Sequence, residues 1–255
     1  MSPVYFYILI RSWKAFDNFD RCLNSVFIQT YNNYKILFVD DASPLNKKQR
    51  MYIKDKLKKH VVVFNNKRLY SIRNAYEIIH KYAKNHNAVI FNLDGDDWLP
   101  HSKCLQEIVA VYQNNPICLV TWGECFIWDG NKLSRPSRHV RPNTNLKYPN
   151  IITRKNNYRK YAFLPLHPRT WKVSLFKKIK KKDFLRPNGS WLQFAEDQAI
   201  FYPMLEMAAG RYSVLNQPIY VYNTGTNNSD AKRNFWGLLK DELIIRKKKQ
   251  YEPII

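Results

Sequence analysis

The sequence is poor in cysteine. Its 255 residues include four cysteines, Cys22, Cys104, Cys118 and Cys125. Their spacing matches no paired zinc motif, and their number is too low for a small disulfide-stabilised scaffold. The four cysteines therefore favour reduced thiols and a reducing compartment.

A long hydrophobic run is also missing from the start of the chain. The opening apolar run, Val4 to Ile10, has the length of one strand, whereas a membrane-spanning helix needs about 20 apolar residues. Arg11 and Lys14 follow it without a small-residue cleavage site, so no signal peptide is predicted. We find no internal repeat and no low-complexity tract. A cytoplasmic protein, soluble or peripherally membrane-associated, is expected.

Acidic residues are scarce compared with basic ones. Lysine and arginine number 42 and aspartate and glutamate 20, which gives a net charge of +22. This surplus predicts an anionic partner: a nucleic acid, a membrane surface or a phosphorylated small molecule. Charge alone does not choose among these three classes.

The first half of the chain alternates short apolar runs with segments of helical period. This pattern is typical of a parallel sheet with helices on its faces. The spacing of Phe19, Leu23, Val26 and Phe27 predicts one buried helical stripe. We therefore predict an α/β fold with one mostly parallel central sheet and flanking helices. The predicted strands are Tyr5 to Ile10, Ile36 to Val39, Val61 to Phe64, Ala88 to Leu93 and Ile117 to Trp122, and the helices lie near 18–27, 47–59, 71–84 and 100–113.

The second half is less regular. Residues 129–160 are rich in Asn, Arg, Pro and Lys and lack periodicity, which indicates a long surface excursion. Helices are predicted at Thr170 to Lys177 and Glu196 to Ala209, and a strand at Ile219 to Tyr222. Residues 231–255 are predicted as a basic amphipathic helix and tail.

Two successive strong strands end in carboxylates. Asp40 and Asp41 follow the second strand, and Asp94, Asp96 and Asp97 follow the fourth, with Gly95 allowing a tight bend. Ligands of open α/β sheets bind beyond the carboxyl ends of the strands. Carboxylate oxygens suit Mg²⁺ or Mn²⁺, and such a cation neutralises a diphosphate. An acidic turn is as often a solvated loop, so this motif alone leaves both interpretations open.

Seven short motifs are taken together: Arg21 to Ser25, Gln29 to Tyr31, Phe38 to Ser43, Ser71 to Ala75, Asn92 to Pro100, His167 to Trp171, and Glu196 with Asp197. With these motifs, the sequence resembles the family 2 glycosyltransferases of the GT-A fold, from about Val4 to Asp230. The resemblance implies one GT-A domain, residues 1–230, with a Rossmann-like nucleotide-sugar-binding half (1–125) and an acceptor-binding, catalytic half (126–230). The chain departs from the family where many members have a Pro-Thr-Tyr-Asn turn and it has Arg11, Ser12, Trp13 and Lys14.

The resemblance also implies roles for individual residues in the nucleotide half. Asp41 would accept a hydrogen bond from the uracil, and Asp94 and Asp96 would be the two acidic ends of a DxD motif that holds the metal and the ribose. Arg73 would lie near the nucleotide, although solvation of a helix is the alternative. Arg11 is assigned to the nucleotide sugar.

Further roles fall in the second half. His167 would complete the metal shell as a neutral imidazole, although a lone histidine is more often structural. Asp197 is the implied general base and Glu196 the weaker candidate; helix N-terminal charge would explain one of them without chemistry. Trp191 would stack on the acceptor or pack in the core. Lys232 is a candidate cation for the diphosphate, and the lysine run 177–182 is interpreted as a solvated face.

These roles predict an inverting transferase that moves a sugar, a hexose, from a UDP-sugar to a hydroxyl of a glycan, a lipid-linked sugar or a protein side chain, with Mn²⁺ or Mg²⁺. The acceptor hydroxyl would attack the anomeric carbon from the face opposite the leaving diphosphate. The chief alternative is a basic nucleic-acid-binding protein without transfer activity, but no recognised nucleic-acid motif accompanies the charge. A third interpretation is an enzyme whose basic tail contacts anionic lipid.

Overall fold

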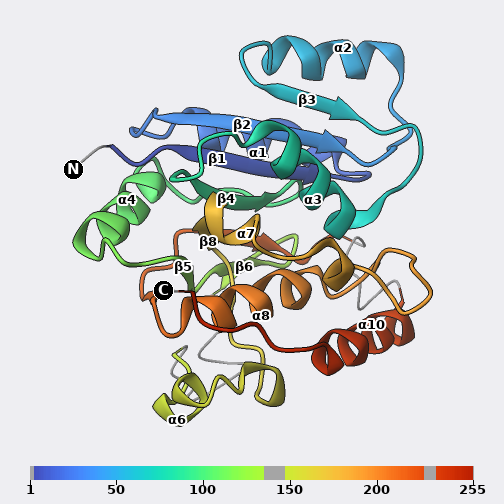
Figure 1. Ribbon diagram of the computed structural model, residues 1–255. Coiled ribbons are helices and arrows are strands. Elements are labelled where there is room, and N and C mark those ends of the chain that lie inside the picture. Colours follow the sequence, from blue (N-terminus) through green and yellow to red (C-terminus); the bar gives the residue numbers. More distant parts are fainter. Residues whose placement is uncertain (1–2, 135–146, 227–233, 255) are drawn as a thin grey trace.

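A mixed sheet of seven strands forms the centre of the molecule, in the order β3-β2-β1-β4-β8-β5-β9. The computed structural model describes residues 3–134, 147–226 and 234–254 (Figure 1). Within this sheet, the strand pairs are parallel except those of β8, which runs antiparallel to β4 and β5. The predicted α/β fold with a mostly parallel sheet is therefore confirmed. The strands are β1 Phe6–Ser12, β2 Tyr34–Asp40, β3 Val61–Phe64, β4 Val89–Asp94, β5 Val120–Gly123, β8 Arg169–Lys172 and β9 Tyr212–Leu215.

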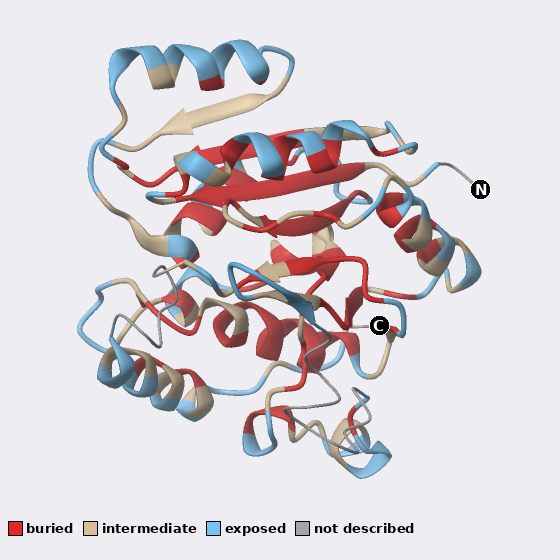
Figure 2. Cartoon of the chain, turned by 180° about the vertical axis from the view of Figure 1, so that it is seen from behind, coloured by how far each residue is buried: buried red, intermediate tan, exposed pale blue. Residues whose placement is uncertain are grey.

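Helices cover both faces of this sheet. Successive side chains of β1 point to opposite faces and belong to two separate hydrophobic cores. Phe6, Ile8 and Ile10 pack with α1, α2 and α4, whereas Tyr7 and Leu9 pack with α3, α7 and α8. Strand residues alternate between faces, so one strand supplies both cores. Figure 2 shows the sheet and α8 as mostly buried. The helices are α1 Phe19–Phe27, α2 Lys47–Lys56, α3 Tyr70–Tyr82, α4 Cys104–Asn114, α6 Asn150–Arg154, α7 Val173–Phe176, α8 Glu196–Ala208 and α10 Phe235–Lys247.

A smaller sheet of three strands lies beside the acidic turn that follows β4. It consists of β6 (Phe126–Trp128), β7 (Leu133–Ser134) and β10 (Val221–Asn223), in the order β10-β6-β7. An isolated bridge between Trp98 and Val221 joins the turn to β10. This sheet therefore brings the 219–226 segment against the acidic cluster.

The structure corrects several sequence predictions. Thr170 to Lys177 was predicted as a helix, but it begins as strand β8 and continues as the short helix α7. Thr170 and Trp171 are fully buried between β4 and β5, so pairing on both sides overrides the local pattern. The helix predicted from Pro100 begins at Cys104. Phe27 is largely exposed, so the buried stripe of α1 is carried by the other three predicted residues and Cys22.

The excursion and the tail are described in part. Residues 135–146 of the excursion and 231–233 of the tail lie outside the described residues. The rest of the excursion includes β7, α6 and a short 3₁₀ turn, Tyr158–Lys160. The predicted tail helix is present as α10. Within the described part of the chain, no helix combines the length and the apolar character that a membrane crossing needs. All four cysteines are buried as free thiols.

Two buried ion pairs attach the tail to the domain. The guanidinium of Arg159 donates to both carboxylate oxygens of Glu206, at 2.5 and 2.9 Å, and to the carbonyl of Ile245 in α10 at 2.6 Å. Asp241 of α10 accepts two hydrogen bonds from Arg186, at 2.7 and 2.8 Å. The tail helix is therefore part of the folded domain.

We expect Glu206→Ala to lower the free energy of unfolding by about 3–5 kcal/mol, because it leaves the buried Arg159 guanidinium without its carboxylate. Urea titration measures the change. The matched control is Glu77→Ala, which removes an exposed partner of Arg73 and should change stability by less than about 0.5 kcal/mol. Equal effects of the two substitutions would contradict the structural role of the buried pair.

Candidate active site

The candidate site begins where β1 and β4 end side by side. Arg11 of β1 lies in register with Asp94 of β4. The backbone N–H of Gly95 then donates to the Arg11 carbonyl at 2.9 Å. A Cβ atom at Gly95 would lie 2.9 Å from that carbonyl oxygen and 3.0 Å from the Cβ of Ser12. The acidic turn therefore requires glycine at this position.

The Arg11 guanidinium joins the acidic turn to the start of α8. It lies 3.0 Å from Asp94 and 2.7 Å from Glu196, and it also donates to Asn92 at 2.8 Å. Burial alone would raise the pKa of Asp94, but the charge of Arg11, the other positive groups nearby and the hydrogen bond from Arg11 together outweigh it and hold this pKa below its ordinary value. Burial raises the pKa of Glu196 although Arg11 opposes the shift. The contact of Arg11 with the nucleotide sugar stays a prediction; in the structure its guanidinium contacts two carboxylates.

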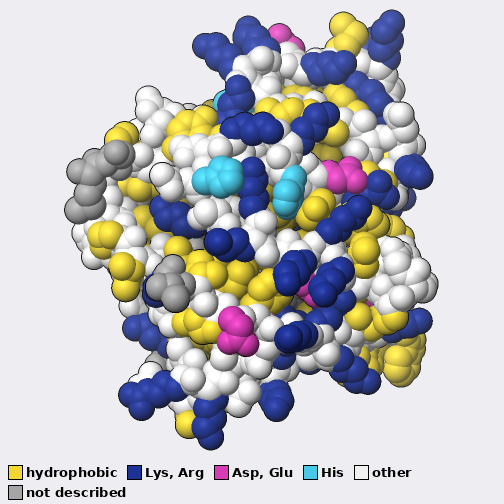
Figure 3. Space-filling view, viewed as in Figure 1, with side chains coloured by type: hydrophobic (Ala, Val, Ile, Leu, Met, Phe, Trp, Pro, Cys, Tyr) yellow, Lys and Arg dark blue, Asp and Glu magenta, His cyan; other side chains and the backbone are white. Residues whose placement is uncertain are grey.

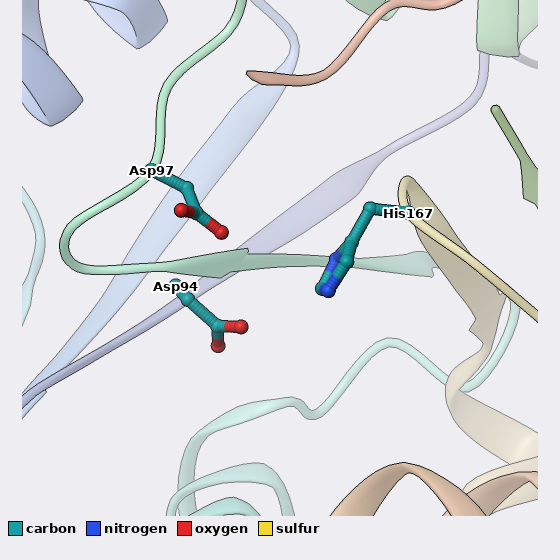
Figure 4. Close-up of side chains that lie close together, drawn as sticks. All are labelled: Asp94, Asp97 and His167. Carbon is teal, nitrogen blue, oxygen red and sulfur yellow. The ribbon is translucent and has the colours of Figure 1, made fainter. Parts of the chain in front are cut away.

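Three potential metal ligands converge beside this arginine. One ligand atom each of Asp94, Asp97 and His167 lies within 4.8 Å of the other two (Figure 4). The Nδ1 atom of His167 is buried without a hydrogen-bond partner. Burial, and then the charge of Arg169, lower the pKa of His167 to about 3, so the imidazole is neutral at physiological pH. Two carboxylates and a neutral imidazole fit a divalent cation, which would also engage the unpaired nitrogen.

Tyr220 contacts all three of these residues. Its hydroxyl donates to Asp97 at 2.6 Å and accepts from the backbone N–H of Asp94 at 3.1 Å. Its ring stacks on His167 with a centroid distance of 4.5 Å. Burial, with the nearby charges of Asp96 and Asp94, raises the pKa of Asp97 well above its ordinary value. Sequence reasoning placed Tyr220 only in a strand, because no short motif marks a tyrosine that orders a distant turn.

Asp96 lies outside this group of three. Its carboxylate accepts from the Thr226 hydroxyl at 3.0 Å, and its carbonyl accepts from the Asn223 side chain at 3.1 Å. The 223–226 turn therefore holds the middle acidic residue. The assignment of Asp96 to the metal stays a prediction, whereas Asp94 and His167 of the predicted set lie close together.

Asp197 lies next to Glu196 at the start of α8 and is held by a second arginine. Arg169 of β8 donates to its Oδ2 atom at 3.0 Å, and the N–H of Gln198 donates to Oδ1 at 2.8 Å. The Asp197 side chain is 30% exposed, so it is partly accessible to solvent. Arg169 also acts electrostatically on Asp94 and His167. The candidate base and the acidic turn therefore occupy the same edge of the sheet.

Asp41 is already engaged within the chain. Its two carboxylate oxygens accept from the backbone N–H groups of Leu69 and Tyr70, at 2.7 and 2.9 Å, and from Asn65 at 2.9 Å. Arg68 lies 3.7 Å away and packs over the Trp13 ring at 3.6 Å. Asp41 thus orders the loop before α3, and its contact with uracil stays a prediction.

The remaining predicted residues lie along α3 and the approach to α8. Arg73 forms an ion pair with Glu77 at 2.7 Å and lies 5.7 Å from the Trp191 ring. Trp191 is half-buried. Its ring centroid lies 5.4 Å from that of Tyr76 and 5.7 Å from the Lys181 ammonium. Lys232 lies outside the described residues. Contacts of Arg73, Trp191 and Lys232 with substrates stay predictions.

The model of the family "Glycosyl transferase family 2" matches residues 7–180, which is more than half of the chain. The chain belongs to glycosyltransferase family 2. The match includes the acidic turn and the His167 segment, and the family is that of the predicted resemblance. Comparison with curated proteins gives no match.

Solved structures are similar to this chain in fold. S. aureus TarS 1–349 is 18% identical, with a TM-score of 0.61 over 86% of this chain and 60% of that chain. The same protein in complex with UDP-GlcNAc is 16% identical, with a TM-score of 0.60 over 91% of this chain and 61% of that one. The mannosyltransferase PcManGT from Pyrobaculum calidifontis, in complex with GDP-Man and Mn²⁺, is 13% identical, with a TM-score of 0.58 over 98% of this chain and 68% of that one.

These likenesses confirm the predicted GT-A fold. The chain spans about 60% of the TarS 1–349 chain. Neither the family nor the fold supports the nucleic-acid-binding alternative.

The environment of His167 predicts how stability depends on pH. In metal-free buffer, we expect the free energy of unfolding of His167→Gln to fall less than that of the wild type between about pH 7 and pH 5. The folded pKa is about 3, whereas an unfolded histidine titrates near 6.5. The unfolded chain therefore binds more protons, so stability present above about pH 6.5 is lost as the pH falls, by about 2 kcal/mol at pH 5.

Urea titrations at the two pH values measure this difference. The control is His86→Gln at an exposed histidine, which should keep the wild-type slope. A His167→Gln variant with an unchanged slope would show that this imidazole is not buried in its neutral form.

Proposed function

We propose that the chain is an inverting, metal-dependent hexosyltransferase that takes its sugar from a UDP-sugar. The observation that carries this proposal is the bridge made by Arg11 between Asp94 and Glu196. It places the acidic turn, which suits a metal and diphosphate, beside the start of α8, where Asp197 is the candidate base. If the acidic turn and Asp197 lay on opposite sides of the molecule, one substrate complex could not contact both, and the proposal would have no basis.

The donor half is proposed to be residues 1–125. Asp94 would contact the ribose, Asp41 the uracil, and Arg73 and Lys232 the rest of the nucleotide sugar. Support comes from similar structures in complex with UDP, with UDP-GlcNAc, and with GDP-Man and Mn²⁺. Because those chains are under 20% identical to this one, they support a nucleotide-sugar donor without selecting its base or sugar.

The metal site is proposed at the acidic turn. Asp94 and His167 would hold the ion, with Asp96 from the DxD motif or Asp97 from the observed cluster as the second carboxylate. Bound Mn²⁺ or Mg²⁺ would offset the negative charge that develops on the leaving diphosphate. The chain's own contribution is to keep the imidazole neutral and to hold Asp94 through Arg11.

Asp197 is proposed as the general base in the half formed by residues 126–230. Arg169 and the Gln198 N–H orient its carboxylate from one side, and its partial exposure leaves room for an acceptor hydroxyl. As the acceptor oxygen bonds to the anomeric carbon, the bond from that carbon to the diphosphate oxygen breaks and the hydroxyl proton passes to Asp197. Attack on the face opposite the diphosphate inverts the anomeric centre. Glu196, held by Arg11, is the weaker candidate for this role.

The acceptor is proposed to be a hydroxyl group of a glycan or of a protein side chain. Trp191 offers a partly exposed aromatic surface on the approach to α8, beside Arg73 and Lys181. Sugar rings pack on such surfaces through their apolar faces, while cations at the edge contact hydroxyl groups. Trp191 would therefore position the acceptor before Asp197 removes its proton.

Binding of donor and metal can be tested together by thermal unfolding. A UDP-sugar at about one hundred times its dissociation constant should stabilise the wild type by about 2.7 kcal/mol with Mn²⁺, and much less with a chelator. Asp96→Ala and Asp97→Asn, titrated with Mn²⁺, distinguish the two proposed ligand sets, because only loss of the true ligand weakens the metal response. No Mn²⁺-dependent stabilisation by any UDP-sugar would refute the donor and metal assignments.

The base assignment has its own test. Asp197→Asn should retain Mn²⁺-dependent donor binding while kcat for transfer falls by about a hundred- to ten-thousand-fold, the usual contribution of a general base. Glu196→Gln is the matched neighbour, and it should affect donor binding through Arg11 as well as the rate. Full transfer by Asp197→Asn would remove it from the base role.

A further inference from the structure

Helix α10 presents a row of large apolar side chains to solvent. Trp236 is 76% exposed, Phe235 58%, Leu243 50% and Leu239 37%. At about 100° per residue, these four positions fall within one arc of about 100° on the helix. Single apolar residues are common on protein surfaces, but a contiguous row on one helix face marks an interaction site.

The opposite face of α10 already fixes the helix to the domain. Asp241 and Ile245 are buried there. Asp241 pairs with Arg186 and accepts the backbone N–H groups of Gln193 and Phe194, at 2.9 and 3.1 Å. The outward row is therefore not needed to hold α10 in place, and its exposure calls for a separate explanation.

Basic side chains border this apolar row. Lys240 and Lys247 are exposed on α10, one helical turn from Leu243. Both acidic residues of α10 are paired with arginines, Asp241 with Arg186 and Glu242 with Arg246. They therefore do not offset the lysines.

The lysine run 177–182 adds to this border. Lys248, which follows α10, donates to the carbonyls of Lys182 and Leu185, at 3.2 and 2.7 Å, so the run meets the carboxyl end of the helix. Figure 3 shows hydrophobic side chains gathered over α10 at the lower right, with lysine and arginine around them. A compact surface thus combines apolar side chains with a positive rim.

We propose that this face of α10 docks on the surface of an anionic lipid bilayer. Phe235, Trp236, Leu239 and Leu243 would enter the boundary between headgroups and acyl chains while the lysines contact lipid phosphates. A second copy of the chain is a poor occupant, because each copy carries a charge of +22. A nucleic acid would engage the lysines but would leave the leucines in water. The proposal does not depend on the identity of the donor sugar.

Co-sedimentation of the full chain with vesicles tests the proposal. The wild type should bind vesicles of phosphatidylcholine with phosphatidylglycerol, bind pure phosphatidylcholine far less, and release as salt is raised. Trp236→Ser/Leu243→Ser should lower the partition coefficient by about tenfold or more, because it removes two of the inserted side chains. Lys240→Glu/Lys247→Glu should lower it on anionic vesicles.

Matched controls lie on α2 and before β5, away from α10 (Figure 1). Met51 and Ile117 are 60% and 66% exposed, so Met51→Ser/Ile117→Ser removes similar apolar surface. Lys47→Glu/Lys48→Glu makes the same charge change on α2. Both controls should bind nearly as the wild type does. The proposal is overturned if the wild type ignores anionic vesicles, if the α10 variants bind like their controls, or if ultracentrifugation shows a dimer that Trp236→Ser/Leu243→Ser dissociates.

Discussion

A buried guanidinium placed between two carboxylates is the interaction on which the rest of the site depends. Arg11 contacts Asp94 from the acidic turn and Glu196 from α8; Arg11 and Glu196 are largely withdrawn from water, and the Asp94 side chain is 33% exposed. Without the positive charge, two carboxylates would face one another in a poorly solvated space, and one of them would be driven to its neutral form. Buried ion pairs add little net stability compared with apolar packing, but breaking one is costly. Arg11 therefore fixes the arrangement of three separate segments more than it stabilises the domain.

Support for this arrangement comes from two further directions. On one side, Tyr220 of the segment leading into β10 holds the acidic turn and stacks on His167. On the other, Asp241 of α10 holds Gln193 and Phe194, which lead into the start of α8. Ala195 follows in the left-handed region at φ 54°, a conformation that non-glycine residues adopt only when their surroundings impose it. The candidate base is thus presented by backbone that the C-terminal helix restrains.

The sequence predicted the first half of the sheet well because its strands are strong apolar runs. β1, β2 and β4 are mostly buried apolar runs, and β3, a half-buried edge strand, was predicted with its observed bounds. β8 was mistaken for helix because its strand character comes from partners on both sides. Its Thr170 hydroxyl is 2.6 Å from the Thr121 hydroxyl and 2.9 Å from that of Tyr112, a buried polar contact that no periodicity reveals.

The sequence predicted which residues form the candidate site, but not which of them contact one another. Asp94, His167 and Asp197 were predicted because each lies in a short sequence motif. The partners Arg169 and Tyr220 come from segments distant in sequence from the groups they hold. Arg11 was assigned to the nucleotide sugar from its place after the first strand. That it neutralises two carboxylates follows only from how β1, β4 and α8 meet.

The local charge of the site bears on how a strongly basic protein would hold a diphosphate. The chain carries +22 overall, but at the site Arg11 and Arg169 are already paired with Asp94, Glu196 and Asp197. Asp96 and Asp97 lie in the same turn, so among the described residues of the site carboxyl groups outnumber guanidinium groups. From these residues alone, a diphosphate would meet net repulsion. Because the same excess of carboxylates attracts a divalent cation, a metal would reverse the sign of this interaction. In the proposed function the ion would therefore supply the local positive charge, while the general basicity of the chain suits long-range attraction of anions to its surface.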